Sequence, residues 1–241
     1  MIKIKPFKKA KFNKTIQIKK MFDIIYHNYD KINNIISFGY DRKWRKKLSE
    51  IIINYNPKLV LDLATGTGNI PILLVNKLKK LNLLGIDISN KMISIGKNKL
   101  KNYKNVKLIK ADCQKLFFIK KNQFDIVTIV FGIRNFENIN NVFKEIYRVL
   151  SLNGYLIILE FSKSNNYFNF NYIYKFYSKK IIPLIIKSFY KNLFAYNYLI
   201  KSIDFFYKNV NLKKKFKQFN FKLIKTIQLT FGIVSIYIAK K

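Results

Sequence analysis

A glycine turn between an apolar run and an apolar helix pattern constrains the fold of this chain more than any other feature. Residues 59–63 form a short, mainly apolar run that is dense enough for a strand buried on both faces. Gly66 and Gly68 follow, and the missing Cβ of glycine lets the backbone turn tightly and a ligand approach the main chain. Residues 72–78 then have the apolar spacing of a helix packed on a sheet. This order predicts the first unit of a nucleotide-type α/β fold, with a ligand at the carboxyl end of the first strand; a purely structural turn is the alternative.

Two features near the turn narrow the choice of ligand. The third glycine of the dinucleotide fingerprint is missing, because Pro71 follows Gly66 and Gly68, and this argues against a pyrophosphate. Asp87 ends the next apolar run, about 20 residues further on, where a carboxylate can accept from both hydroxyls of a ribose. We therefore expect a ligand with a ribose and no pyrophosphate, and S-adenosylmethionine (SAM) is the most common ligand of that kind.

The rest of the chain continues the alternation of strands and helices. Such alternation implies right-handed crossovers and a mainly parallel sheet. Ser89 is a suitable N-cap for the helix after Asp87, and Asn153-Gly154 is expected to close a helix over residues 142–150. The other apolar runs predict strands at residues 83–86, 106–109, 124–130 and 155–159, and a closing hairpin of residues 221–229 and 234–238 around Phe231-Gly232.

The region before the first strand has helical spacing. Apolar residues recur with helical period in residues 18–29 and 44–52, and because these helices precede the first strand they can cap the open end of the site. Residues 1–16 are basic, lack a clear period and are expected to be loose. We therefore expect an N-terminal helical cap within residues 1–56.

An aromatic segment, residues 163–200, interrupts the alternation. It suits an extra helical layer over the sheet, and it suits equally a tunnel or lid for an apolar substrate, or a surface that rests on a bilayer. We expect a helical aromatic insert over residues 163–205, within a single domain that spans residues 1–241.

The formal net charge of +35 suggests, by itself, a nucleic acid or an anionic membrane as partner. However, the chain is rich in Lys, Asn, Ile, Phe and Tyr, which have A/T-rich codons, so base composition explains the lysines without any partner. The lysines are also spread along the chain. We expect a solvated basic surface and no specific nucleic-acid partner. The alternative from a different functional class is a basic nucleic-acid-binding protein on this fold, whose affinity must weaken steeply with salt.

Cys113 is the only cysteine and His27 the only histidine, so an intrachain disulfide is impossible and no metal site is expected. Residues 1–20 lack the apolar core of a signal peptide. The most hydrophobic later stretch, residues 181–200, contains two lysines and is too polar for a spanning helix. We expect a cytoplasmic protein with, at most, a loose peripheral contact with a membrane.

An ordered set of motifs over nearly the whole chain resembles the quinone-biosynthesis C-methyltransferases, a family of class I SAM-dependent methyltransferases. Residues 131–135, F-G-I-R-N, are the most specific motif. Residues 61–69 are similar to the SAM-binding motif, with Asn69 where Asp is more usual. Residues 204–207 replace a proline-containing loop, and Tyr237 stands where many relatives have His; both departures concern the substrate end. The other similar segments are Met21-Phe22-Asp23, Tyr29-Asp30, Asn33, Ser37, residues 39–45, residues 159–163, Tyr196, Tyr198-Leu199, Ser202-Ile203 and residues 232–234.

The resemblance implies a Rossmann-like sheet of seven mostly parallel strands, with the last strand antiparallel. It implies a transferase that methylates a ring carbon of a polyprenylated quinol. The substrate would be demethylmenaquinol, in the last step of menaquinone biosynthesis, or the ubiquinone precursor 2-methoxy-6-polyprenyl-benzoquinol. Ala64-Thr65 before Gly66 favours the naphthoquinone. Within the enzyme class, the alternative is another small-molecule methyltransferase, for which the aromatic insert would be only a core layer.

The resemblance also implies roles in SAM binding. The Gly66-Thr67-Gly68 turn would approach the methionine part of SAM, and Asp62 would help to orient it. Asp87 would accept from both ribose hydroxyls, since an ionised carboxylate forms strong charge-assisted hydrogen bonds. Asp112 and the Cys113 backbone would flank the adenine. The alternatives are a helix cap for Asp112 and a packed thiol for Cys113.

For the acceptor, we expect Arg134 and Asn135 to orient the hydroquinone oxygen. A guanidinium stabilises a developing phenolate or positions a water that takes the proton. Tyr29 and Asp30 are further candidates from the cap. A salt bridge that only fixes the loop is the alternative role for Arg134, and His27 is expected to be incidental.

Overall fold

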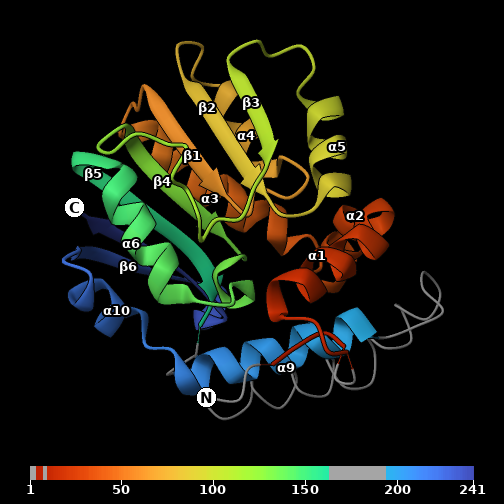
Figure 1. Ribbon diagram of the computed structural model, residues 1–241. Coiled ribbons are helices and arrows are strands. Elements are labelled where there is room, and N and C mark those ends of the chain that lie inside the picture. Colours follow the sequence, from red (N-terminus) through yellow and green to blue (C-terminus); the bar gives the residue numbers. More distant parts are fainter. Residues whose placement is uncertain (1–3, 8–9, 163–193) are drawn as a thin grey trace.

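A seven-stranded sheet forms the centre of the described part of the chain (Figure 1). The structure, a computed structural model, describes residues 4–7, 10–162 and 194–241. The strand order is β3-β2-β1-β4-β5-β7-β6; the first five strands in that order are parallel, and β7 is antiparallel to both of its neighbours. The expected Rossmann-like fold is confirmed. The strands are β1 (Leu59–Leu63), β2 (Asn82–Asp87), β3 (Val106–Lys110), β4 (Phe124–Val130), β5 (Leu150–Phe161), β6 (Lys222–Leu229) and β7 (Val234–Lys240).

Apolar side chains alternate between the two faces of the sheet. In β1, Leu61 and Leu63 belong to one core and Val60 to the opposite core. This burial on both faces explains why the strands read as continuous apolar runs. One face packs against α3 (Tyr40–Asn54), α4 (Asn69–Val75) and α5 (Asn90–Lys99), and the other against α6 (Ile139–Val149) and α10 (Leu212–Gln218).

The start of α4 depends on Gly68. Its φ of 76° lies in the left-handed region, which glycine adopts without strain. A Cβ at Gly68 would lie 2.9 Å from Leu100 Cδ1 and 3.3 Å from the Cα of Gly96 in α5. Gly68 is therefore required both for the turn and for the close packing of the turn on α5. The predicted N-cap of α5 is confirmed, because the Ser89 hydroxyl accepts from the backbone N–H of Met92.

The boundary between α6 and β5 differs from the prediction. The helix ends at Val149, and Leu150 already pairs with Phe124 of β4. Asn153, with φ 67°, and Gly154 lie in an irregular part of β5 and do not close the helix. The prediction was wrong because apolar residues at 149 and 150 fit a helix face and a buried strand equally well.

The N-terminal segment is more ordered than its sequence suggests. Helix α1 (Lys14–Ile25) begins before residue 18, with Asn13 as its N-cap. The fully buried Gln17 holds the preceding loop: its Nε2 donates to Phe12 O (2.7 Å), and its Oε1 accepts from Phe7 N (2.9 Å). The expectation of a loose segment was therefore wrong for the described part of residues 1–16, because a polar side chain organises it.

Helices α1, η1 (Tyr26–Asn28) and α2 (Tyr29–Ile36) lie beside the carboxyl end of the sheet, and α9 (Phe194–Asn209) runs next to them (Figure 1). Ile18 and Met21 of α1 pack against Tyr198 of α9. Most of the expected aromatic insert, residues 163–193, lies outside the described residues; residues 194–205 are helical. Within the described ranges, no helix is long and apolar enough to cross a membrane.

Candidate functional site

A cavity opens at the carboxyl ends of β1 to β4, and we refer to it as the strand-end cavity. It lies where β2 and β4 diverge to opposite sides of β1, the position at which open α/β sheets bind ligands. Residues of the cap close its other side. The lining residues are Thr15, Ile18, Phe22, Tyr29, Ala64, Gly66, Asp87, Ile88, Met92, Asp112, Cys113, Gln114, Val130, Phe131, Gly132, Asn135 and Phe136.

Two further cavities adjoin the strand-end cavity. The helix cavity lies between α1, α2 and α9, and the two-arginine cavity, of about 230 Å³, contains Arg45 and Arg134 in an otherwise mostly apolar wall. Tyr29 lines all three cavities, and Phe131 lines both the strand-end and the two-arginine cavity. A ligand in the two-arginine cavity would therefore be a direct neighbour of a ligand in the strand-end cavity. The apolar wall of the two-arginine cavity includes Ile36, Trp44, Phe161, Leu199, Ile200, Ile203 and Ile233.

Asp87 connects the end of β2 to the glycine turn. Its Oδ2 accepts from Gly66 N and its Oδ1 from Ser89 N, both at 2.9 Å. Burial raises the pKa of Asp87 to about 6, although these backbone hydrogen bonds oppose the rise. Each carboxylate oxygen retains acceptor capacity toward the cavity that Asp87 lines. The side chain can therefore accept from two ligand hydroxyls while it holds the turn.

Asp62, Asp112 and Cys113 have different environments. Asp62 is buried beneath the turn, where Thr128 Oγ1 donates to its Oδ1 (2.6 Å) and burial raises its pKa to about 6. Asp112 accepts from the backbone N–H and the side-chain amide of Gln114 at 2.9–3.2 Å, and both residues line the strand-end cavity. Cys113 is a buried thiol whose pKa is raised by burial, which makes it unreactive.

Asp30 attaches the cap to the glycine turn. Its carboxylate accepts from Thr67 Oγ1 (2.8 Å), Asn69 Nδ2 (2.9 Å) and Lys99 Nζ (2.6 Å). Burial raises the pKa of Asp30, but the hydrogen bonds from Lys99, Asn69 and Thr67 outweigh it, and the net pKa lies below its usual value. An Asp at position 69, which the family resemblance leads one to expect, would bring a second carboxylate toward Asp30. Asn69 donates an amide N–H there instead.

The ends of β1 and β4 approach each other closely. A Cβ at Gly132 would lie 2.6 Å from the Cβ of Ala64, so only glycine fits. Ala64 and Phe131 both adopt positive φ, 56° in each case, which is uncommon outside glycine. Strained backbone of this kind persists only where the surrounding structure holds it, and both residues line the strand-end cavity.

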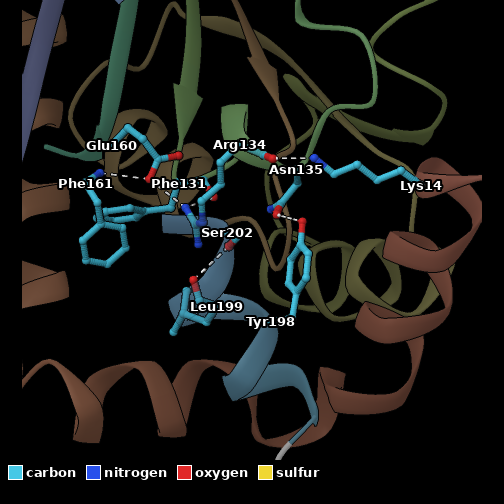
Figure 2. A network of polar contacts seen from close by, with 9 residues as sticks. All are labelled: Lys14, Phe131, Arg134, Asn135, Glu160, Phe161, Tyr198, Leu199 and Ser202. Carbon is cyan, nitrogen blue, oxygen red and sulfur yellow. Dashed lines mark hydrogen bonds and ion pairs between the residues drawn. The ribbon is translucent and has the colours of Figure 1, made fainter. Parts of the chain in front are cut away.

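Arg134 forms a buried ion pair with Glu160 (Figure 2). Its Nη1 donates to Glu160 Oε1 at 2.7 Å and to Phe131 O at 2.8 Å. Burial raises the pKa of Glu160, and the charge of Arg134 opposes the rise. Among the described residues, Arg134 Nε and Glu160 Oε2 are buried without a hydrogen-bond partner. The guanidinium is thus fixed by one edge and keeps donor capacity for a ligand.

Asn135 and Tyr29 lie at the junctions of the cavities. Asn135, which lines the strand-end and helix cavities, accepts from Tyr198 Oη of α9 at 3.1 Å (Figure 2). Burial raises the pKa of the Tyr29 phenol, while the positive charges of Arg45 and Arg134 oppose the rise. The positive charges of both guanidinium groups therefore influence the Tyr29 phenol, which lies where the three cavities meet.

The structure brings together most of the residues that the sequence singled out. Arg134 lines the helix and two-arginine cavities. Four predicted residues line none of the three cavities: Thr67 and Gly68 belong to the turn itself, and Asp30 and Asp62 lie beside it. His27 is exposed and also lies outside them. In the described part of the chain, no group of three His, Cys, Asp or Glu side chains could hold a metal ion. The predicted residues in the strand-end cavity are Tyr29, Gly66, Asp87, Asp112, Cys113 and Asn135.

Several residues in or next to the cavities were missed. Glu160 and Arg45 lie inside matched motifs, but nothing in their spacing indicates that Glu160 would meet Arg134 or that Arg45 would reach the same cavity. Gln114 and Met92 could have been found, because each follows a predicted strand end by a few residues.

Comparison with known proteins gives concordant results. The ubiE/COQ5 methyltransferase family matches residues 8–241. A protein from Bacteroides fragilis named demethylmenaquinone methyltransferase is 36% identical over 99% of this chain and 98% of its own length. A protein from Rickettsia bellii named ubiquinone/menaquinone biosynthesis C-methyltransferase UbiE is 38% identical, over 98% of this chain and 97% of its own. A solved structure from Thermotoga maritima, a SAM-dependent methyltransferase described as a possible histamine N-methyltransferase, has a TM-score of 0.57 at 18% identity and covers 93% of this chain and 99% of that one; it shows likeness of fold alone.

Proposed function

The chain belongs to the ubiE/COQ5 methyltransferase family, and we propose that it methylates a ring carbon of a polyprenylated quinol, with demethylmenaquinol as the first candidate. The resemblance noted from the motifs is confirmed, and the protein is a SAM-dependent methyltransferase. The observation that carries the proposal is the contact between two different cavities. A polar cavity suited to SAM shares Tyr29 and Phe131 with an apolar cavity that contains two arginines.

The residues of the strand-end cavity fit SAM. A Cβ added at Gly66 would meet no atom within 4 Å, so the main chain is open for a ligand to approach. We assign the ribose hydroxyls to Asp87, the adenine to Asp112 and the Cys113 backbone, and the methionine part to the glycine turn, with Asp62 beneath it. SAM supplies a methyl group that is already activated by its sulfonium. For the methyl donor, the chain has therefore only to hold the sulfonium in line with the acceptor and exclude water.

The acceptor requires more of the protein, because a ring carbon is a weak nucleophile. We assign the ring to the junction of the cavities, where Arg134 and Asn135 face it together with Tyr29. A guanidinium beside a ring oxygen stabilises the phenolate form and raises the electron density of the neighbouring carbon. Arg134 is suited to this because Glu160 holds one edge of it while Nε remains unpaired.

Asp30 has a different position from the other three acceptor candidates. Among the described residues, its carboxylate accepts hydrogen bonds from Thr67, Asn69 and Lys99 alone. We therefore propose that Asp30 holds the cap against the SAM turn, and that Tyr29, next to it in α2, is the cap residue that contacts the acceptor.

The choice between the two quinones rests on relatives. Both a demethylmenaquinone methyltransferase and UbiE proteins are similar to this chain, so the benzoquinol precursor of ubiquinone is the second candidate substrate. A polyprenylated quinol resides in a membrane. We accordingly propose a protein on the cytoplasmic side that contacts the bilayer surface peripherally, for which the net charge of +35 suits anionic lipids.

Two measurements test the proposal. The purified protein, with SAM and short-chain demethylmenaquinol or the benzoquinol precursor, should give a product with one additional methyl group by mass spectrometry. Expression in a methyltransferase-null strain should restore methylated quinone in its lipid extract. Absence of methyl transfer to either quinol in both assays would refute the proposed substrate class. Calorimetry with RNA at two salt concentrations addresses the alternative, since binding through phosphates must weaken with salt.

A further inference from the structure

Two arginines from different parts of the fold line the two-arginine cavity, and their surroundings differ. Arg134, from the loop after β4, is ion-paired with Glu160. The guanidinium of Arg45, from α3, forms no hydrogen bond or ion pair with any residue of the described ranges, and its Nε is buried. Its guanidinium carbon lies 5.4 Å from the centre of the Phe131 ring.

No carboxylate of the described residues is in direct contact with the Arg45 guanidinium. The Asp41 carboxylate, one helical turn earlier, accepts from the Ser37 hydroxyl at 3.1 Å and forms no ion pair with Arg45. The electrostatic effect of Arg45 falls on the Tyr29 phenol and the buried Asp62. A buried donor without a partner is unfavourable, and an acceptor atom of a ligand in this cavity would remove that cost.

The cavity also indicates the kind of acceptor. Aromatic rings surround the two guanidinium groups: Arg45 stacks over Phe131, and Arg134 lies 5.4 Å from the Phe161 ring. The two rings themselves are 5.1 Å apart. Flat apolar walls with two cationic donors suit a flat ring that carries two oxygen acceptors.

We propose that Arg45 positions the acceptor by donating to one of the two quinol oxygens, while Arg134 donates to the other. The inference rests on the proposed function, because it assumes a quinol in this cavity. In this arrangement the enzyme recognises both oxygens of the quinol, and not only the oxygen that Arg134 binds. Arg45 is a substrate-positioning residue in this scheme.

The test combines variants with blocked substrates. The probes are short-chain demethylmenaquinol and its two monomethyl ethers, which block one oxygen each and are measured as competitive inhibitors. Against wild-type protein, each ether should bind about 10- to 100-fold more weakly than the quinol, the loss expected for one hydrogen bond to a charged group. In Arg45→Gln the penalty for one ether should disappear while the penalty for the other remains. Arg45→Lys should restore part of it.

The controls separate the possible failures. Arg42→Gln, an exposed arginine of the same helix that lines none of the three cavities, should behave as wild type. If Arg45 only compensates the charge of Asp62, Arg45→Gln would weaken SAM binding or stability and retain the wild-type preference between quinol and ethers, which would overturn the inference. Should Arg45→Gln fail to fold, Arg45→Lys decides alone, because unchanged inhibitor constants in it would also overturn the inference. Wild-type protein that methylates no quinol would refute the proposed function instead.

Discussion

The guanidinium of Arg134 lies 2.7 Å from the carboxylate of Glu160, and both side chains are almost excluded from solvent. Arg134 follows β4 and Glu160 lies near the end of β5, so the pair connects the loop of the most specific motif to the neighbouring strand. The ion pair and the proposed catalytic role are therefore compatible. The same contact that fixes the loop also sets the orientation of the guanidinium in the cavity.

Replacing Arg134 should abolish catalysis and leave cofactor binding intact. We expect Arg134→Ala to lower turnover by orders of magnitude, because the phenolate loses its cation, while the SAM affinity measured by calorimetry stays near that of wild type. Since the variant leaves Glu160 buried and unpaired, the double variant Arg134→Ala with Glu160→Gln is the matched control. Equal losses of turnover and SAM affinity would contradict the assignment.

Replacing Glu160 should destabilise the fold. Glu160→Ala leaves a buried guanidinium unpaired, and we expect the free energy of unfolding to fall by about 3–5 kcal/mol in urea titrations. Asp204→Ala, which breaks the exposed pair with Lys208, should cost at most about 1 kcal/mol. Similar costs for the two variants would show that the Arg134 pair contributes no more than a surface contact.

The affinity for SAM should depend on pH through Asp87. Its carboxylate has a pKa of about 6 without ligand, and hydroxyl donors favour its ionised form. The affinity should therefore fall as the pH decreases through about 6. The stability of the ligand-free protein should change in the opposite sense: a folded pKa above the unfolded value contributes stability below the unfolded pKa, and this is lost as the pH rises through about 6.

Asp87→Asn provides the control for this pH effect. It should lower SAM affinity about 10- to 100-fold at neutral pH and flatten the pH dependence. Asp62 titrates in the same range but lines none of the cavities, so Asp62→Asn should retain the pH dependence of binding. If the slope survives in Asp87→Asn and is lost in Asp62→Asn, the ribose assignment is wrong.

Asp30 should affect SAM binding through the turn. Asp30→Ala removes the hydrogen bonds from Thr67 and Asn69, and we expect SAM affinity to fall about tenfold, the effect of one or two such bonds. Lys99→Met removes a partly exposed ion pair, which contributes about 0–1 kcal/mol, and an exposed hydrogen bond to Asn69 Oδ1, and it should change the affinity less. Calorimetry on both variants would disprove this account if Lys99→Met were the more damaging change.

Two glycine variants separate crowding from backbone strain. Gly132→Ala places a Cβ 2.6 Å from Ala64 Cβ, and we expect a loss of about 1–3 kcal/mol of unfolding free energy together with lower turnover, because the loop of Arg134 must shift. Gly66→Ala meets no atom but must keep a φ of 57°, so it should weaken SAM binding more than it lowers turnover at saturating SAM. If urea unfolding and kinetics showed that Gly66→Ala costs more stability and turnover than Gly132→Ala, this distinction between crowding and strain would be wrong.

The sheet was predictable because its strands are short apolar runs between clear turns. The number of strands and the antiparallel last strand followed from the family resemblance, whereas the strand order and the register came only from the structure. The boundary between α6 and β5 could not be predicted, since Leu150 suits both elements. Its pairing with Phe124 places it in the strand. The ordered conformation of the segment before α1 depends on the single polar residue Gln17, and hydrophobic periodicity does not reveal such a residue.

The cofactor end of the site was more accessible to sequence reasoning than the acceptor end. Gly66, Asp87 and Asp112 each follow a predicted strand, and parallel strands bring such residues to one edge. The surroundings of Arg134 come from segments far apart in the chain, including Glu160, Tyr198 and the cap. Their meeting depends on how helices cross the sheet edge, which residue spacing does not encode.

The position of β7 has a consequence for biosynthesis of the protein. It follows β6 in the chain but lies between β5 and β6, so on a translating ribosome β5 stays an open edge until residues 234–240 emerge. Strands β1 to β4, whose carboxyl ends carry the proposed SAM-binding residues, can pair earlier. Glu160, opposite Ser235 in the register, gains its neighbour only afterwards. A nascent chain is therefore expected to form the strands of the proposed SAM site first, and to complete the surroundings of Glu160 only when the last strand is inserted.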